Sequence, residues 1–581
     1  MPFAAVTLAE WRAQVEKELA GKSFDKVLVH ETLEGVKIAP LYAEAPPLPR
    51  DTAGRHFRIC MRAEAGIAKA DLLADVNGGA DALWIHDEKV LGFLNEEAHN
   101  RLQLVFGIDA PVADVASRVL LQVEGRESFL LGCDPIAQMA RGTSAYGSLA
   151  DELAQLAHVA KKLTTGTRSA TAMPGASAAS APATPPSVPP ATALVSTLAY
   201  HDAGAGAADE IAFALSTGVR YLQALTDGGL TPDQAARQIA LQVATGRDTF
   251  LELCKLRALR IVWNKVLTAA GAKNGVSPVV HAVGSMRTLT VRDPWVNMLR
   301  ATTQTFSAVL GGADLVTPSA FDAASGAPSA LGRRVARHTP LILREESSLG
   351  KVADPAGGAY YFDSATDSLA REAWNRFRAL EKDGGIVTAL ESGRLAKKLE
   401  DDWKTRLAEI ARRKTSILGV SEFAHLEEKL PRPAPPVETA APRAGALHAH
   451  RDSAPFEALR SAAESKKTLP EAVLVTLGPF AESRPRAGFA AGFFSAGGIR
   501  TRETTTDEKA YIACLCGSDE RYATDAIARV RALKAAGCTR VLLAGRPGAQ
   551  EAALREAGAS GFIFVGCDLV AILADLLDGA R

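Results

Sequence analysis

PVVHAVGSMRTLTVRDPWVNMLRATTQTFSAVLGGADLVTPSAF, residues 278–321, holds two short apolar runs on either side of a longer segment with helical spacing. The runs VVHAVG and ADLVTP are rich in valine, alanine and leucine and are short, which is typical of buried strands. The segment DPWVNMLRATTQTFSAVLGG between them predicts a helix that ends at a glycine pair. Strand, helix and strand in this order form a βαβ unit, whose two strands lie parallel in one sheet.

The same alternation extends over most of the chain on both sides of this unit. HFRICMR, DALWIHD and SRVLLQVEG (56–62, 81–87 and 117–125) predict strands, and AKADLLADVNGG and NEEAHNRLQLVFG (68–79 and 95–107) predict helices or turns. Roughly eight strand–helix units over about 370 residues fit a (β/α)8 TIM barrel with insertions. We therefore expect an α/β fold class, with an N-terminal barrel over residues 51–428.

The first 50 residues predict an extended arm that precedes the barrel. Thr7 and Glu10 have the spacing of a capping box, in which hydroxyl and carboxylate satisfy free backbone donors at a helix start. The apolar residues of this helix share one face by their spacing: Leu8, Trp11, Val15 and Leu19. The arm ends in the proline-rich stretch APPLPR. Because such an arm has little core of its own, we expect residues 1–50 to contact a partner subunit.

Two stretches of biased composition interrupt the pattern. Residues 165–193 are dominated by alanine, proline and serine, which leaves little to bury, so we expect a flexible surface insertion within the barrel. Residues 429–465 begin with KLPRPAPPVETAAPRAGALHAHRDSAP, and we expect a linker there. The linker separates the barrel from a last unit over residues 466–581.

This last unit predicts an open sheet. Five short strands alternate with helices: EAVLVTLG, IRTRET, AYIACLC, RVLLAG and GFIFVG. That alternation predicts a flavodoxin-like, doubly wound α/β domain. Its first strand-to-helix turn lies within LGPFAESRPRAGFAAGFFSAGG (477–498), at the carboxyl edge where such sheets bind ligands. Arg484 to Phe494 predict a packed helix that ends at Gly497 and Gly498.

Composition excludes several classes of function. The chain has 66 Lys and Arg and 66 Asp and Glu, so its net charge is zero. A neutral chain has neither the basic footprint of a nucleic-acid binder nor a polybasic membrane anchor, and no apolar run predicts a membrane span or a signal peptide. The seven cysteines are odd in number and no pair has zinc or redox spacing. We expect reduced thiols, no metal site and a cytoplasmic protein.

Long ordered stretches of the chain resemble one enzyme family. DPWVNMLRATTQTFSAVLGG and FDAASGAPSALGRRVARHTPLILREESSLGKVADPAGGAYYFDSATDSLAREAW, within residues 293–374, resemble the adenosylcobalamin-dependent methylmalonyl-CoA mutases. EWRAQVEKELAGKSFDKVLVHETLEGVKIAPLY resembles their opening arm, and TLAYHDAGAGAADEIAFAL resembles a central barrel segment. The resemblance covers nearly the whole chain apart from the two proline-rich stretches. The family contains catalytic chains and, in heterodimeric enzymes, a shorter second chain of the same architecture.

The resemblance implies a cobalamin motif at the turn after the first strand of residues 466–581. Family members carry Lys-x-Gly-x-Asp-x-His-x-x-Gly there, in which the His binds cobalt and the Asp and Lys support it. The matching positions here are Thr476, Gly478, Phe480, Glu482 and Pro485, of which only the glycine is retained. Phenylalanine cannot accept a hydrogen bond from imidazole, and glutamate is a hard oxygen ligand. We expect a degenerate domain that holds no cofactor.

The same comparison applies to the barrel. The family's catalytic Arg, Gln, Trp and His positions fall on Val279, Val283, Arg287 and Thr317. Valine offers neither charge nor donor to a substrate carboxylate, which favours a bidentate arginine. The family tyrosine of the first barrel strand is also missing, since no tyrosine occurs between Tyr42 and Tyr146. We expect no catalytic residue here, a barrel interior closed by apolar packing, and a satisfied core histidine at position 281.

The resemblance therefore implies the small, non-catalytic subunit of a heterodimeric methylmalonyl-CoA mutase. Its large partner subunit would hold adenosylcobalamin and the acyl-CoA and would interconvert (R)-methylmalonyl-CoA and succinyl-CoA. Three alternatives stay open from the sequence. The partner could be a related acyl-CoA mutase of the isobutyryl or ethylmalonyl type, the chain could be a free-standing scaffold, or its C-terminal sheet could retain cobalamin binding without a histidine ligand.

Overall fold

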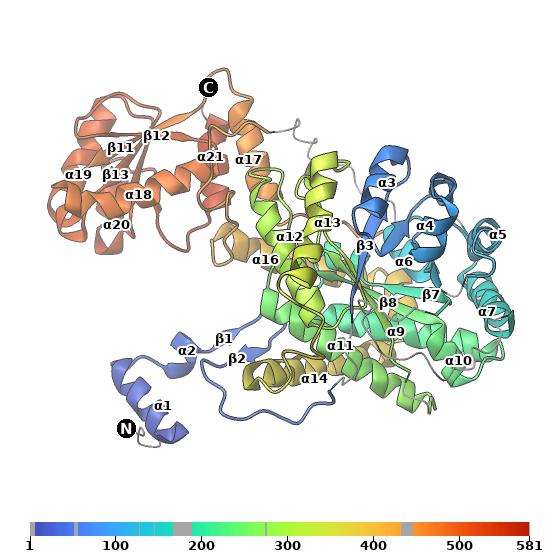
Figure 1. Ribbon diagram of the computed structural model, residues 1–581. Helices are drawn as coiled ribbons and strands as arrows, with labels where there is room; N and C mark the ends of the chain where they lie inside the picture. Colours follow the sequence, from blue (N-terminus) through green and yellow to red (C-terminus); the bar gives the residue numbers. More distant parts are fainter. Residues whose placement is uncertain are drawn as a thin grey trace.

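The computed structural model describes residues 6–50, 56–126, 128–144, 146–166, 189–273, 276–430 and 446–579. An extended N-terminal arm, a large barrel and a smaller C-terminal sheet follow one another along the chain, and the arm and the smaller sheet both project from one side of the barrel (Figure 1). Residues 167–188 of the predicted insertion lie outside the described residues. Its predicted ends do not hold, because residues 165–166 close helix α7 and residues 191–193 open strand β7.

Eight parallel strands close into a barrel, as predicted. The strand order is β10-β3-β4-β5-β6-β7-β8-β9, with hydrogen bonds between β10 and β3 completing the ring. The strands are β3 (Arg58–Ala63), β4 (Ala82–Ile85), β5 (Gln103–Phe106), β6 (Phe129–Cys133), β7 (Ala191–Ser196), β8 (Ile239–Thr245), β9 (Val279–Gly284) and β10 (Leu315–Thr317). A closed ring has no free edge, so every strand is paired on both sides.

Helices surround the barrel because each strand is followed by a segment whose apolar residues recur at helical spacing. The outer ring comprises α3 (Lys69–Asn77), α4 (Glu96–Arg101), α5 (Val112–Val119), α6 (Pro135–Arg141), α7 (Leu149–Gly166), α8 (Leu198–Asp202), α9 (Ala207–Asp227), α10 (Pro232–Arg237), α11 (Thr249–Ala269), α12 (Val296–Leu310) and α13 (Ala330–Glu345). Three further helices, α14 (Tyr360–Lys382), α15 (Gly385–Glu391) and α16 (Arg394–Ala411), follow, and α14 packs against α9 and α11.

One predicted strand is wrong, and the sequence analysis located none of the four strands β5 to β8. Residues 117–125 are the end of α5 and the turn after it, because Val112, Val115, Ala116 and Val119 bury one helical face. The strand of this region is β6, at residues 129–133, and residues 95–107, predicted as helix or turn, end in β5. Short apolar runs do not distinguish a strand from a buried helical turn.

The interior of the barrel contains both apolar and polar side chains. One side chain in two points inward from each strand, and the apolar ones form a cluster around the axis: Cys60, Ala82, Trp84, Val105, Leu130, Ala191, Leu194, Ala240, Val283 and Leu315, with Val279 and Leu198 packed against it. Buried polar residues on the same inward faces include Gln103, Gln242 and His281. Val279 and Val283 pack in this apolar cluster, but the polar side chains beside it show that the interior is not closed by apolar packing alone.

The C-terminal sheet is parallel, with five strands in the order β12-β11-β13-β14-β15. They are β11 (Glu471–Thr476), β12 (Arg500–Thr504), β13 (Ile512–Cys516), β14 (Arg540–Ala544) and β15 (Gly561–Ile563). Helices α17 (Ala454–Glu464), α18 (Phe480–Ala496) and α21 (Leu569–Gly579) contribute to the apolar cluster on one face, and α19 (Asp519–Ala535) and α20 (Glu551–Glu556) to that on the other.

The predicted linker over residues 429–465 is not irregular throughout. Residues 431–445 lie outside the described residues, but residues 454–464 form α17. Phe456, Leu459 and Ala463 of this helix are buried in the apolar cluster of the C-terminal sheet. The helix was missed because its apolar residues follow directly on a proline-rich stretch.

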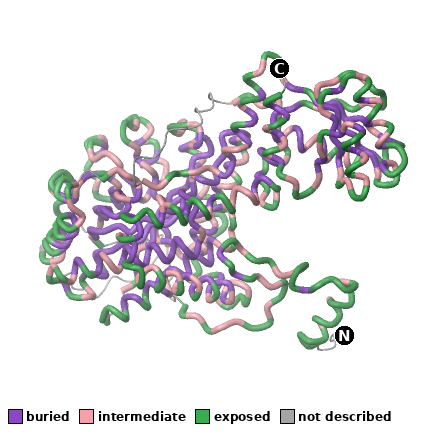
Figure 2. The backbone as a smooth tube through the Cα atoms, turned by 180° about the vertical axis from the view of Figure 1, so that it is seen from behind, coloured by how far each residue is buried: buried purple, intermediate pink, exposed green. Residues whose placement is uncertain are grey.

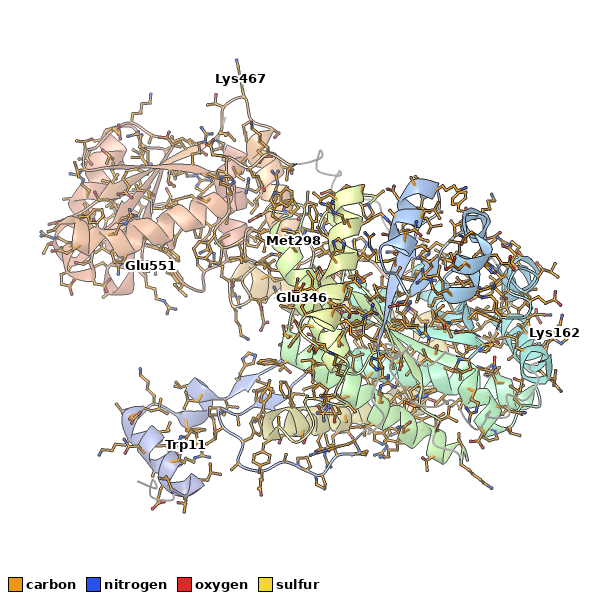
Figure 3. The ribbon with its side chains drawn as sticks, viewed as in Figure 1. Trp11, Lys162, Met298, Glu346, Lys467 and Glu551 are labelled. Atoms are coloured by element: carbon orange, nitrogen blue, oxygen red, sulfur yellow. The ribbon has the colours of Figure 1, made fainter. Side chains whose placement is uncertain are left out.

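The N-terminal arm consists of α1 (Leu8–Glu18), α2 (Phe24–Leu28) and a hairpin of β1 (His30–Glu31) with β2 (Lys37–Ile38). The predicted capping box at Thr7 and Glu10 is present. Helix α1 has no buried residue and lies away from the barrel, as its exposed colouring in Figure 2 and the position of Trp11 in Figure 3 show. Among the described residues, its one aromatic contact is internal to the arm, between Trp11 and Phe24.

The substitution Gly132→Ala should strongly destabilise the barrel. Gly132 lies in β6 at φ +65°, and a Cβ atom there would overlap the carbonyl oxygen of Phe106. Left-handed strain and steric overlap together should cost about 3 kcal/mol or more. Gly125→Ala is the matched control, because φ is +79° there but no atom lies within 4 Å of the added carbon; it should cost about 1 kcal/mol. Urea unfolding followed by circular dichroism measures both, and equal losses would contradict the steric argument.

Candidate functional site

A cavity of about 490 Å³ opens at the carboxyl ends of the barrel strands. In TIM barrels this end carries the active site, because the loops that follow the strands converge there. Polar and apolar residues from β3 through the loop after β9 line the cavity, together with residues close to α17: Arg62, Trp84, His86, Asp109, Asp134, Gln138, Arg141, Leu194, Ser196, Leu198, Asp202, Gln242, Val283, Met286, Leu447 and Ala449.

A chain of hydrogen bonds crosses four strands below this cavity. The Ser196 hydroxyl donates to Gln242 Oε1 at 2.8 Å, and Gln242 Nε2 lies 3.0 Å from Nδ1 of His281. His281 Nε2 lies 2.8 Å from Thr317 Oγ1. Both ring nitrogens of this fully buried histidine are therefore satisfied, and burial lowers its pKa to about 3. The prediction of a core histidine is confirmed.

Of the four barrel positions predicted from the family pattern, only Val283 and Thr317 come together. They are register partners on β9 and β10 and both line a cavity of about 390 Å³ that adjoins the first, which Val283 also lines. Val279 packs in the barrel interior. Arg287 is buried beyond the end of β9, where its Nη1 donates to the carbonyl oxygens of His201 and Ala205.

Residues 446–453, which we call the strap, run across the mouth of the barrel. The backbone N–H of Leu447 donates to Ala140 O at 2.8 Å, and that of His450 donates to Asp202 O at 2.8 Å. The N–H of Asp452 donates to Arg287 O at 2.9 Å. Leu447 and Ala449 line the cavity. The chain itself therefore covers part of the opening through which a ligand would enter.

The sequence reasoning missed the polar residues of the cavity. Arg62 lies over the Trp84 ring at 4.8 Å, and its Nε lies 3.1 Å from Nε2 of His86. Burial, followed by the nearby charge of Arg62, lowers the pKa of His86 to about 4. Burial raises the pKa of Asp202 to about 6. The sequence does contain a signal for these two side chains. Arg62 and His86 lie two positions after the inward residues Cys60 and Trp84, so alternation along each strand points them toward the barrel axis as well.

A buried charge network lies beside the mouth, between α9, α11 and the loop after β9. Lys255 is fully buried, and its Nζ lies 2.6 Å from Glu252 Oε2 and 3.2 Å from Glu210 Oε1. His201 lies 2.8 Å from Glu210 through Nδ1 and 2.7 Å from the Ser285 hydroxyl through Nε2. Burial holds the pKa of His201 well below its usual range, so the ring is neutral and Nδ1–H donates to Glu210.

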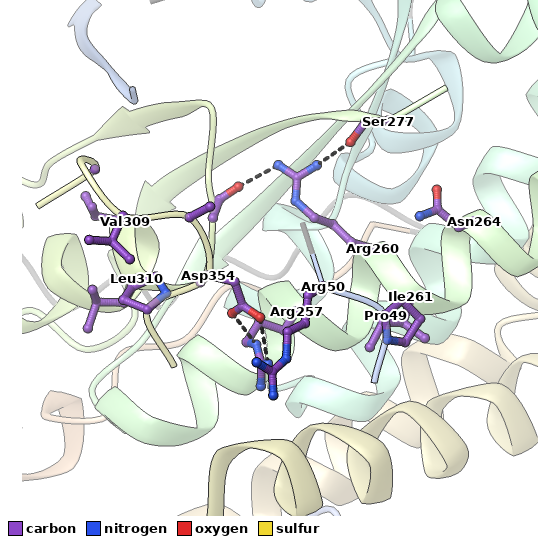
Figure 4. A pocket seen from close by; sticks show the side chains of 16 residues that line it. Pro49, Arg50, Arg257, Arg260, Ile261, Asn264, Ser277, Val309, Leu310 and Asp354 are labelled. Carbon is purple, nitrogen blue, oxygen red and sulfur yellow. Dashed lines mark hydrogen bonds and ion pairs between the residues drawn. The ribbon is translucent and has the colours of Figure 1, made fainter. Parts of the chain in front are cut away.

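Another cavity, of about 370 Å³, lies beside the amino-terminal ends of β9 and β10. Figure 4 shows its two inner arginines engaged with the protein itself. Arg257 forms two hydrogen bonds to Asp354, and Arg260 donates to Ser277 and to the carbonyl of Gly312. These side chains hold the loop around residue 354 and the strand entries, which is a structural role.

The turn after β11 leads directly into a helix. Gly478 has φ +77°, and Pro479 precedes α18, which begins at Phe480 rather than at Arg484 and ends before Gly497 and Gly498 as predicted. The Thr476 hydroxyl donates to Thr504 O at 3.2 Å. The Phe480 side chain is 70% exposed. Pro485 lies inside the helix, so the turn has no long loop that could close over a ligand.

Two ion pairs bridge the crevice between the turns after β11 and β13, where ligands bind in open parallel sheets. Arg521 of α19 lies 3.0 Å from Glu482 of α18. Arg486 of α18 lies 2.5 Å from Asp519 and donates to the carbonyl oxygen of Gly517 at 2.7 Å. The side chains of the two helices thus link the walls of the crevice to each other.

Comparison with known proteins identifies the family. The family profile described as methylmalonyl-CoA mutase matches residues 185–475. A protein of Streptomyces virginiae named methylmalonyl-CoA mutase small subunit is 35% identical over 635 aligned positions, which cover 99% of this chain and 97% of that protein. The chain belongs to the methylmalonyl-CoA mutase family. This family comprises isomerases of the intramolecular transferase type, as the resemblance of residues 293–374 implied.

Other relatives match over shorter regions. A small subunit of methylmalonyl-CoA mutase from Propionibacterium freudenreichii subsp. shermanii is 37% identical over 400 positions, or 65% of this chain and 61% of the relative. A methylmalonyl-CoA mutase of Escherichia coli is 32% identical over 233 positions, or 39% of this chain and 33% of the relative. The relatives named as small subunits therefore match over longer regions than this mutase does.

The methylmalonyl-CoA mutase family is cobalamin-dependent, and the turn after β11 is where the family resemblance implies a cobalamin motif. The turn offers an exposed phenyl ring, a carboxylate engaged by Arg521 and a proline, and none of these supplies a neutral nitrogen ligand. The crevice beside it is bridged by two ion pairs. The residues present do not fit adenosylcobalamin.

Within the part of the chain that the structure describes, no helix combines the length and the apolar character that a membrane crossing requires. The described residues also contain no group of three or more histidine, cysteine, aspartate or glutamate side chains suited to a metal ion. All seven cysteines are free.

The substitution Lys255→Met should destabilise the protein in a pH-dependent way. It leaves Glu210 and Glu252 buried without their shared cation, which typically costs about 3–5 kcal/mol. Burial raises the pKa of both carboxyls, so the folded state binds protons at a pH where the unfolded chain has released them. The loss should therefore shrink as the pH falls from about 8 to about 5.

Urea unfolding at several pH values measures this effect. Lys404→Met is the matched control, because Lys404 pairs with Glu400 and Asp401 at the exposed surface. The control should change the free energy of unfolding by less than about 1 kcal/mol at every pH. A loss for Lys255→Met that is the same at both ends of the pH range would show that the two glutamates do not protonate in the variant.

Proposed function

We propose that this chain is the small, non-catalytic subunit of a heterodimeric methylmalonyl-CoA mutase. The observation that carries the proposal is the end-to-end similarity to the Streptomyces virginiae protein named as a small subunit, which covers nearly the full length of both chains. The partner would be a large subunit that binds adenosylcobalamin and the acyl-CoA. In that partner (R)-methylmalonyl-CoA and succinyl-CoA would interconvert, while this chain supports it.

The barrel supports a non-catalytic role for this chain. Val279 and Val283 belong to the apolar cluster around the axis, so no charged group at these positions could hold a substrate carboxylate. The Thr317 hydroxyl is engaged by His281 at 2.8 Å, which leaves it poorly placed to polarise a thioester carbonyl. Arg287 is buried against backbone carbonyls beside α8 and holds the strap.

The C-terminal unit supports the assignment of the cofactor to the partner. Its strand order, which is 2-1-3-4-5 along the chain, supports a flavodoxin-like domain of the kind that binds cobalamin in this family. The replaced positions at Thr476, Phe480, Glu482 and Pro485 lie at its first turn. With the crevice bridged by Arg521 and Arg486, we infer that the domain serves as a structural unit.

The N-terminal arm supports an obligate partner. An isolated helix as short as the 11 residues of α1 is marginal in water. Its capping box helps only modestly, and several apolar side chains of the arm are exposed: Val6, Leu8, Val27, Leu33 and Leu41. Contact with the large subunit would cover these side chains. Interfaces of such permanent complexes often exceed about 2,000 Å².

The division of the chain is part of the same proposal. Residues 1–50 are the partner-contacting arm, residues 51–428 the barrel, residues 429–465 the connection and residues 466–581 the degenerate cobalamin-type domain. We also propose a cytoplasmic location, which the free state of all seven cysteines supports.

Co-expression with the candidate large subunit tests the central proposal. With an affinity tag on this chain alone, we expect the large subunit, cobalamin and mutase activity to co-purify, with the two chains in equal amounts. This chain purified alone should be inactive on methylmalonyl-CoA. Turnover by the chain alone would contradict the argument from Val279, Val283 and Thr317. A chain that is well folded, inactive and recovers no partner would instead favour a free-standing scaffold.

A variant in the arm separates the arm's contribution from that of the barrel. Leu8 is 52% exposed on α1, so Leu8→Glu should leave this chain folded but lower the amount of large subunit recovered. Gln14→Glu on the same helix adds the same charge without removing an apolar side chain and serves as the control. Equal recovery with both variants would exclude α1 from the interface.

Titration of the full chain with adenosylcobalamin tests the assignment of the cofactor. We expect no saturable binding and no shift of the visible spectrum, because the turn after β11 lacks a nitrogen ligand and the adjacent crevice is bridged. The co-purified heterodimer is the positive control and should bind one cofactor per pair. Saturable micromolar binding to this chain alone would show that its C-terminal sheet retains the site.

A further inference from the structure

The outer face of α12 carries apolar side chains where the surface of a soluble protein usually carries charges. Leu299 is 62% exposed, and Trp295, which directly precedes the helix, is exposed as well. The other exposed positions of the helix hold threonine. Its one charged residue, Arg300, donates to groups of the chain itself, including the carbonyl oxygen of Leu418 at 2.6 Å. No exposed position of α12 therefore carries a charge.

The neighbouring helix α13 has its polarity partly inverted. Arg333 and Arg337 are buried and pair with the fully buried carboxylate of Asp75. Two large apolar residues lie on the outer face instead, since Leu331 is exposed and Ile342 is 50% exposed. A surface helix of a soluble protein normally turns its apolar side to the core and its charges to water. The arrangement in α13 is therefore suited to contact with another protein.

The outer faces of α12 and α13 lie next to each other. The two helices pack together in the outer ring, and because each follows a barrel strand, both begin near the carboxyl ends of the strands and run in the same direction. Leu299 and Leu331 both fall within the first four residues of their helices, so they lie at the same level. Ile342 follows Leu331 by about three turns, or roughly 16 Å, on the same side of α13. We call Trp295, Leu299, Leu331 and Ile342 the α12–α13 surface.

The opposite side of the barrel has an ordinary charged surface. Helix α7 exposes Asp151, Lys161 and Lys162, and none of the exposed large apolar side chains among the described residues belongs to α7. Met298 of α12 and Glu346, which caps α13, lie on the side of the barrel from which the arm and the C-terminal sheet project, whereas Lys162 lies on the far side (Figure 3). The α12–α13 surface thus lies on the same side of the barrel as the arm.

We propose that the α12–α13 surface is where the large subunit packs against the barrel of this chain. The inference rests on the proposed heterodimer and adds a second contact to that of the arm. The described part of the arm consists of two short helices and a two-residue hairpin, whereas permanent interfaces often exceed about 2,000 Å². A rigid surface on the same side of the barrel supplies the additional area, so the partner is held between the arm and the two helices.

The composition of the α12–α13 surface defines the kind of partner surface that fits it. Few charges and an aromatic anchor are typical of the centre of a protein–protein interface. The Trp295 ring stacks on the buried ring of Phe321, with 5.0 Å between the ring centroids. This contact fixes the indole before the partner arrives, so covering it costs little side-chain entropy. The matching face of the large subunit should be apolar as well, because an unpaired charge buried against Leu299 would be costly.

Co-purification with the candidate large subunit, followed by mass photometry of a dilution series, tests the surface. Leu299→Glu and Ile342→Glu should each raise the dissociation constant of the heterodimer by about tenfold or more, because each places a carboxylate without a partner in the interface. Both side chains are exposed in this chain, so neither substitution should unfold it. Leu121→Glu is the matched control, because Leu121 is 80% exposed just after α5, on the far side of the barrel (Figure 1). It should leave the dissociation constant within about twofold.

The outcomes separate this inference from the proposed function. If the unaltered chain recovers no large subunit, the heterodimer itself is wrong and the α12–α13 surface with it. If the unaltered chain recovers the large subunit and Leu299→Glu and Ile342→Glu bind it as tightly as Leu121→Glu, only the surface is wrong. If Leu299→Glu abolishes self-association of this chain and leaves the large subunit bound, the surface contacts a second copy, which overturns the assignment to the large subunit.

Hydroxyl-radical footprinting of the unaltered protein tests the surface without any variant. Oxidation of the exposed Trp295 ring should be largely lost when the large subunit is bound, whereas oxidation of Leu121 should not change. Equal oxidation of Trp295 in the free chain and in the heterodimer would overturn the assignment, whatever the variants do.

Discussion

The loop that follows β9, residues 285–293, is held by buried arginines and carboxylates that join the two halves of the molecule. Arg287 donates to carbonyls beside α8, and Arg292 lies 2.6 Å from Glu464 of α17. The backbone N–H of Val291 donates to Glu457 of the same helix at 2.8 Å. Removing one member of a buried pair costs far more than the pair contributes, because the other charge is left uncompensated. The loop therefore sets the position of the C-terminal sheet against the barrel.

The barrel separates two environments that a catalytic barrel would connect. Below the mouth, an apolar cluster surrounds the axis, and the polar layer that crosses it is internally satisfied from Ser196 to Thr317. Above it, the polar side chains of Arg62, His86 and Asp202 line the mouth cavity. Each strand contributes inward side chains at every second residue. An apolar and a polar inward side chain of one strand are therefore only two residues apart. The fold thus keeps the architecture of its family while the axis is filled.

Much of this architecture follows from local pattern, and the remainder depends on contacts between distant residues. The βαβ unit at residues 278–321 was readable because its strands and helix have different periods. The prediction of a strand at residues 117–125 was wrong because the apolar end of a helix and a short strand have similar composition and length. The sequence showed that Arg287 departs from the family pattern. It could not show which contacts Arg287 makes, because its partners His201 and Asp452 lie far away in the sequence. The residues that line the mouth cavity likewise come from six strands, so no local sequence pattern predicts the cavity.

The path of the strap makes the chain difficult to divide. Residues 446–453 lie on the barrel, and the helix that follows them, α17, lies in the core of the C-terminal sheet. A cut at residue 465 would strip that sheet of Phe456 and Leu459 and leave them uncovered on the barrel, whereas a cut at residue 428 would uncover the mouth cavity. Residues 446–464, which the sequence predicts to be part of a linker, thus cover the barrel mouth and also fill the core of the C-terminal sheet. The barrel and the sheet are therefore coupled as one cooperative unit of folding.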